Sequence, residues 1–227
     1  MNSDTFLGKF YQFGEGVLFL FYVNLLWVIG TTMGLLFFGV GPSTVAMFTI
    51  FRKWSMGEKG FSVGKIFLAV YRKEFWRANT LSWLMFLFGM MLIVNLQFFA
   101  VGNDTWNFLF KAVFMIIFLL YMIMLIYLFP LYVHYQTTFK QYFKNAFLIA
   151  IYQPVRTIYL LAACFTLYYL WVTFPIFIVF FGASLTSFIV MWISYRTFAR
   201  IEYKQSLLQE KEDLLQQPIV NREGMTT

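Results

Sequence analysis

The chain has 227 residues, of which 61% are hydrophobic and only 12% are charged. A soluble domain carries about 25% charged residues, so this composition excludes a water-soluble globule, and the 31 Phe, 14 Tyr and 7 Trp exclude a disordered chain. A single cysteine, Cys164, and a single histidine, His134, exclude an intramolecular disulfide and a Cys/His zinc site, and we expect neither a metal nor a cofactor. The net charge of +7 favours loops that face an anionic membrane over a nucleic-acid surface.

Four apolar stretches have the length of about 20 residues that a helix needs to cross the hydrocarbon core. They cover residues 17–40, 80–101, 112–133 and 157–195. The last stretch is long enough for two spans, and Pro175 disfavours helix at the residue before it, so we place a hairpin there. The sequence therefore predicts an all-α, polytopic membrane protein with about five transmembrane helices. We expect one membrane domain over residues 1–200, followed by a cytoplasmic tail over residues 201–227.

The orientation of the spans is predicted from the distribution of Lys and Arg. Fifteen basic residues lie in the segments 41–78 and 134–156 and in the tail, whereas the remaining segments carry only Lys9 and Lys111. The asymmetry predicts a bacterial plasma-membrane protein with its N-terminus outside and its C-terminus in the cytoplasm. A re-entrant or interfacial helix at residues 42–56 keeps this orientation, but a sixth crossing there places the N-terminus on the opposite side of the membrane.

Two polar segments on the predicted cytoplasmic side have the pattern of amphipathic interfacial helices. Residues 63–77 and 138–150 each place aromatic side chains on one face and basic side chains beside or opposite them. Because basic and aromatic residues favour both anionic lipid and protein interfaces, we predict a lipid-binding or partner-binding surface here. Its basic residues are Lys65, Arg72, Lys73, Arg77, Lys140 and Lys144.

A few polar residues lie within the predicted spans. Asn24 and Asn95, with the ring of Trp27, are candidates for an intramembrane polar site, and the alternative is that they make hydrogen bonds between helices. Gly30 and Gly34 have the spacing of close helix packing, within one chain or in a homodimer.

A helix boundary is predicted at Gly41 and Pro42, because proline is tolerated in the first turn of a helix. We expect span one to end here and a new helix to begin near Ser43, with the Gly-Pro pair as a candidate hinge. A signal peptide is the competing interpretation of residues 1–40, but the apolar run is longer than the 7–15 residues of a signal-peptide core.

The motifs of common catalytic sites are absent from the sequence, including the P-loop, the dinucleotide fingerprint, HExxH and the nucleophile elbow. We therefore predict that the chain is not an enzyme. The middle of each span also lacks charged residues and histidine, which argues against an ion-coupled transporter acting alone.

The chain resembles the YesL-like family of bacterial integral membrane proteins. The resemblance rests on the strings Asn24-Leu25-Leu26-Trp27, Gly39-Val40-Gly41-Pro42-Ser43-Thr44-Val45-Ala46, Arg52-Lys53-Trp54, Gly57-Glu58, Phe143-Lys144-Asn145-Ala146 and Arg156-Thr157. It implies a multi-span protein of unassigned activity, often encoded beside carbohydrate ABC-importer genes. Together with the absence of charge within the spans and the basic cytoplasmic helices, this neighbourhood leads us to expect an accessory or regulatory component of carbohydrate uptake, in contact with the membrane subunits of an ABC importer. The alternative is a stand-alone small-solute transporter or channel.

Overall fold

The computed structural model describes residues 6–58, 60–99, 105–135 and 137–216, and the regular secondary structure of these residues is entirely helical. Five of the helices, α1, α3, α4, α6 and α7, are long and apolar enough to cross a membrane. The predicted class of all-α, multi-span membrane protein is thereby confirmed. In chain order the helices are α1 (Phe6–Met33), α2 (Val40–Ser55), α3 (Val63–Phe98), α4 (Thr105–His134), α5 (Phe139–Tyr152), α6 (Pro154–Thr173) and α7 (Ile176–Gln216).

Helix α2 is the central element of the bundle and packs against α1, α3, α4 and α7. Its 16 residues make a helix of about 24 Å. Nine of its residues are buried, including Ala46, Ile50 and Phe51. Its basic residues, Arg52 and Lys53, lie in the last turn, where their positive charges interact favourably with the negative end of the helix dipole.

The break between α1 and α2 lies earlier than the sequence predicts. Helix α1 ends at Met33, and its predicted extension to residue 40 is wrong. The turn between the helices brings Gly34 against Gly39, so closely that a Cβ atom on Gly34 would lie 2.3 Å from the Gly39 Cα atom. Within this turn Leu35 and Leu36 adopt positive φ angles of 54° and 64°, which leucine rarely does. The close approach at Gly34 and Gly39 leaves no room for a larger residue, and the surrounding apolar residues do not indicate this turn.

Gly41 and Pro42 lie inside the first turn of α2 and are buried. A proline fits there because the amide groups of the first turn have no partner within the helix. A Cβ atom on Gly41 would lie 2.7 Å from the Ser82 hydroxyl of α3, so this glycine permits close contact between α2 and α3. The candidate hinge thus follows the turn between α1 and α2 and does not form it.

The predicted interfacial helix at residues 63–77 is not a separate element, because it forms the first part of the continuous, 36-residue helix α3. The sequence between Lys65 and Thr80 contains neither glycine nor proline, so nothing interrupts the helix where its composition changes. Phe67 is buried on this part of α3 and faces Gly30 of α1. Gly30 is therefore used for packing within the chain.

Helix α1 runs antiparallel to α2. The ring of Phe19, in the first half of α1, lies 5.3 Å from the ring of Trp54 at the end of α2. Farther along α1, the Trp27 indole N–H donates a hydrogen bond to the Thr44 hydroxyl near the start of α2 (3.1 Å). The start of α1 therefore lies at the same end of the bundle as the loop between α2 and α3. We call this end, which also contains the last turns of α2 and α4, the basic end.

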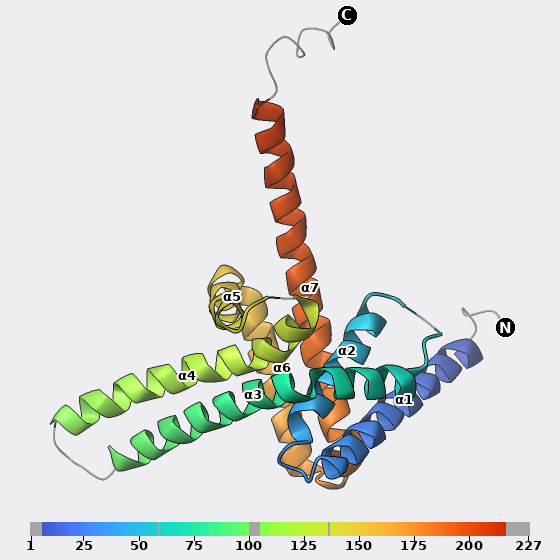
Figure 1. The fold of residues 1–227 in the computed structure, drawn as a ribbon, viewed down its shortest axis with the longest axis horizontal. Coiled ribbons are helices and arrows are strands. Elements are labelled where there is room, and N and C mark those ends of the chain that lie inside the picture. The colour runs from blue at the N-terminus through green and yellow to red at the C-terminus, as the bar shows by residue number, and fades with distance from the viewer. Residues whose placement is uncertain (1–5, 59, 100–104, 136, 217–227) are drawn as a thin grey trace, which may run out of the picture.

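The second half of the chain contains the hairpin of α6 and α7, which turns at Phe174 and Pro175 as predicted. Helix α7 has 41 residues and is about 62 Å long. Figure 1 shows that its first half packs in the bundle while its last turns extend away from the other helices. The described side chains from Glu202 to Asp213 are exposed.

Candidate functional site: a polar latch at the basic end

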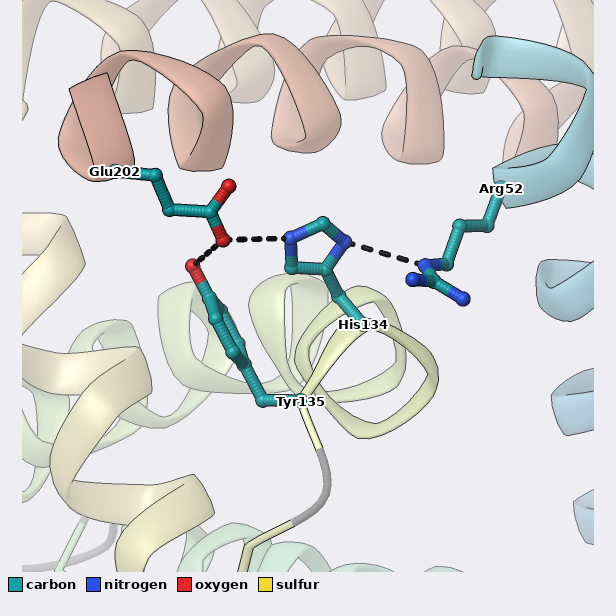
Figure 2. Close-up of polar contacts among 4 residues, drawn as sticks. All are labelled: Arg52, His134, Tyr135 and Glu202. Carbon is teal, nitrogen blue, oxygen red and sulfur yellow. Dashed lines mark hydrogen bonds and ion pairs between the residues drawn. The ribbon is translucent and has the colours of Figure 1, made fainter. Parts of the chain in front are cut away.

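A group of polar side chains joins α2, α4 and α7 at the basic end (Figure 2). It consists of Arg52, His134, Tyr135 and Glu202, and we call it the latch. The Arg52 Nε–H points to His134 Nδ1 at 3.3 Å. On the other side of the ring, His134 Nε2 lies 3.1 Å from the Glu202 carboxylate. The same carboxylate oxygen accepts a hydrogen bond from the Tyr135 hydroxyl at 2.9 Å.

The geometry of the latch defines the tautomer of the histidine. The Arg52 Nε atom can only donate, so His134 Nδ1 is the acceptor and carries no proton. The proton of the neutral imidazole is therefore on Nε2, where it is donated to Glu202. Arg52 and Glu202 thus bind opposite edges of one neutral ring.

The members of the latch differ in how far their side chains are buried. The side chain of His134 is 8% exposed, whereas that of Glu202 is 49% exposed. Burial and the adjacent Glu202 carboxylate raise the pKa of the Tyr135 hydroxyl well above its ordinary value, so this hydroxyl stays protonated and donates. The histidine side chain is therefore enclosed, whereas the Glu202 carboxylate faces the surroundings.

The latch fixes the point at which α7 leaves the bundle. Glu202 lies in α7, with 14 further residues of helix beyond it, and these extend about 21 Å. Nearer the membrane, the Arg196 guanidinium lies over the ring of Trp192 at 3.6 Å, as expected for a pair at a membrane interface. The hydrogen bonds of the latch connect α2, α4 and α7, so its arrangement is suited to holding these helices together.

The latch was not foreseen from the sequence, in which His134 stands alone. Arg52 precedes it by 82 residues and Glu202 follows it by 68 residues. A signal was nevertheless available: Glu202 is the first acidic residue after a long uncharged span, and Arg52 and His134 both lie in the last turn of a helix. Only the packing of α2 between α4 and α7 brings the three residues together.

The polar residues of the candidate intramembrane site form hydrogen bonds between helices or within one helix. Asn24 is 3% exposed; its amide group donates to the Val179 carbonyl of α7 (2.9 Å) and accepts from the Ser184 backbone N–H (3.1 Å). Asn95 is not near it, because its amide donates to the Met91 carbonyl of its own helix (2.7 Å). The structure therefore does not bring Asn24 and Asn95 together. The Trp27 N–H is bound by Thr44, as described above.

The residues of the candidate basic surface are exposed, but they lie on two separate helices, α3 and α5. All six of its Lys and Arg residues are exposed, and in the described part of the chain none of them forms an ion pair. Figure 1 shows the first part of α3 and helix α5 on different sides of α7. Between them lies Tyr132 of α4, whose hydroxyl donates to Glu74 of α3 (2.7 Å) and whose ring packs on that of Tyr142 of α5. The six residues are Lys65, Arg72, Lys73, Arg77, Lys140 and Lys144.

The five long apolar helices define a multi-span helical membrane protein. The model of the family "Protein of unknown function, DUF624" matches residues 20–96, which cover the second half of α1, all of α2 and nearly all of α3. The chain belongs to this YesL-like family, whose function is unassigned.

Three relatives from Bacillus subtilis (strain 168) are similar over nearly their whole length. "Uncharacterized protein YesV" is 33% identical over 200 residues, which are 88% of this chain and 96% of that protein. "Uncharacterized protein YteU" is 32% identical over 214 residues, covering 94% and 96% of the two chains. "Uncharacterized protein YesL" is 28% identical over 195 residues, covering 86% and 91%. No solved structure matches the chain.

Proposed function

We propose that the protein is an accessory or regulatory component of carbohydrate uptake and that it contacts the membrane subunits of an ABC importer. The observation that supports a binding role is the exposed, unpaired state of the six basic residues on α3 and α5 in the described structure. Basic residues beside large exposed aromatics, such as Trp76 (77% exposed), are common anchors of protein interfaces. The association with sugars rests on the gene neighbourhood that the YesL-like resemblance implies.

We further propose that the basic end faces the cytoplasm of a bacterial cell. The support is the excess of Lys and Arg at this end, following the positive-inside rule. Because α2 returns through the bundle antiparallel to α1, this orientation also places the start of α1 on the cytoplasmic side. Five crossings would place the N-terminus outside the cell. We propose instead the alternative arrangement, in which α2 is a sixth passage and the N-terminus is cytoplasmic.

A stand-alone transporter or channel is less well supported. Such a protein needs polar groups that are free to line a pathway, but both polar ends of the Asn24 amide bind the backbone of α7. Asn95 binds its own helix. A catalytic role is also less well supported, because the described histidine is enclosed by Arg52 and Glu202. We therefore propose a binding function without catalysis.

The test is copurification of the tagged chain, in mild detergent, from its host grown on an imported sugar. We expect importer membrane subunits to copurify with the wild type, and the Arg72→Gln/Lys144→Gln variant to lose them. The matched control is Lys204→Gln/Lys211→Gln, which removes the same charge from the extended part of α7. Failure to recover any importer subunit with the wild type contradicts the proposed partner. Equal recovery with the Arg72/Lys144 variant contradicts the proposed surface.

A further inference from the structure

A cavity of about 590 Å³ lies at the basic end, between the first half of α1 and the loop that joins α2 to α3. Its volume is within the range of about 300–1,000 Å³ that is typical of small-molecule sites. Figure 1 shows these two segments side by side, away from α5 and the extended part of α7. The cavity is therefore separate from the latch. Its side-chain walls are Gln12, Glu15, Phe19, Trp54, Glu58 and Phe61.

The charged side chains among the described lining residues of the cavity are both carboxylates. Glu15 comes from α1 and Glu58 from the loop after α2, so the fold brings two carboxylates from distant parts of the sequence into one wall. Glu58 is bound by the Lys53 ammonium at 2.5 Å. Within the described residues Glu15 forms no ion pair. One carboxylate is thus positioned by a lysine, and the other is available to a ligand.

The aromatic wall is held in place by the core. The ring of Trp54 packs at 4.7 Å on Phe188 of α7 and at 5.3 Å on Phe19. Phe19 also packs against the buried ring of Phe51. Because these rings are supported from behind, the aromatic surface exists before a ligand arrives, which lowers the entropic cost of binding.

The chemistry of these walls selects among ligand classes. Carboxylates disfavour an anion, and in the part of the chain that the structure describes no three His, Cys, Asp or Glu residues are grouped to hold a metal ion. Aromatic faces with nearby carboxylates are the usual recognition elements for primary and quaternary amines. We propose that this cavity binds an organic amine, either as a free cation or as the headgroup of a membrane lipid. This inference is independent of the proposed importer partner.

Replacing Gly16 with a larger residue is a specific way to fill the cavity. It is part of the lining, and a Cβ atom added to it would meet no atom within 4 Å. The Gly16→Leu variant should therefore fold normally while its side chain occupies the space. Gly14 also has open space around its Cβ position but does not line the cavity, so Gly14→Leu is a matched control for the effect of leucine in α1.

The experiment measures the melting temperature of the full-length protein in detergent during titration with choline and with ethanolamine. Glycerol serves as the neutral probe. We expect both amines, but not glycerol, to raise the melting temperature of the wild type and of Gly14→Leu. Glu15→Gln should shift the midpoint of the titration to a concentration about tenfold higher, because it removes a charge-assisted contact. Gly16→Leu should show no response.

A second arm distinguishes the source of the amine. The protein is placed in nanodiscs of phosphatidylglycerol, with or without phosphatidylethanolamine. A response to free amines supports a soluble ligand, whereas a rise caused only by phosphatidylethanolamine, and removed by Glu15→Gln, supports a lipid headgroup. An equal response to glycerol, an unchanged response in Gly16→Leu, or no response in either arm would overturn the proposal.

Discussion

Asn24 joins α1 to α7 through both ends of its amide, and replacing it with leucine tests whether this contact is structural. The substitution keeps the approximate size of the side chain but leaves the Val179 carbonyl and the Ser184 N–H of α7 without this partner. Hydrogen bonds between membrane helices contribute about 0.6 kcal/mol on average and up to about 1.7 kcal/mol. Two such bonds give an expected loss of about 1–3 kcal/mol in the free energy of unfolding.

The assay is reversible unfolding in mixed micelles of mild detergent and dodecyl sulfate, followed by circular dichroism. Asn95→Leu is the control, since the Asn95 amide binds only within its own helix and its loss should cost less than about 0.6 kcal/mol. If Asn24→Leu is as stable as the wild type, or if both variants are destabilised equally, the structural role assigned to Asn24 is wrong.

Two further predictions concern the latch and the turn between α1 and α2. Glu202→Gln removes the charge that accepts from His134 and Tyr135, so we expect the latch to weaken by about 1 kcal/mol and trypsin to cleave after Lys204 about fivefold faster. The control Glu212→Gln, in the exposed part of α7, should leave the cleavage rate unchanged, and equal rates in all proteins would count against the latch. Gly39→Ala places a Cβ atom 2.3 Å from the Thr31 carbonyl oxygen, so we expect a loss of about 1–3 kcal/mol in the unfolding assay, or failure to accumulate. Gly14→Ala, with no atom within 4 Å, should be stable, and a stable Gly39→Ala protein would show that the turn differs from the one described.

The elements that the sequence predicted well are those set by local composition. Long uncharged stretches identified the five spans, and Pro175 located the turn between α6 and α7. The segment 138–150 is the separate amphipathic helix α5, which begins where the Gln141 side chain accepts from the Thr138 N–H. In these cases the hydrophobic period and the helix-breaking residues are sufficient.

The features that were missed depend on contacts between distant residues. The turn at residues 34–39 contains Leu35 and Leu36 at positive φ and brings Gly34 close to Gly39, a contact that the local composition does not indicate. The central position of α2 could not be derived from its own composition, which also suits a helix lying at the membrane surface. The latch likewise depends on this position, because α2 brings Arg52 to His134.

The central claim is that the start of α1, the loop after α2 and the extended part of α7 share one end of the bundle and that this end faces the cytoplasm. Its most direct test is cysteine labelling of intact cells with an impermeant thiol reagent, in a Cys164→Ala background. Single cysteines replace Lys9, Lys204 and, as the external position, Asn103. We predict labelling at position 103 in intact cells, and at positions 9 and 204 only after the cells are permeabilised. Labelling of position 9 in intact cells, with position 204 still protected, would contradict the claim.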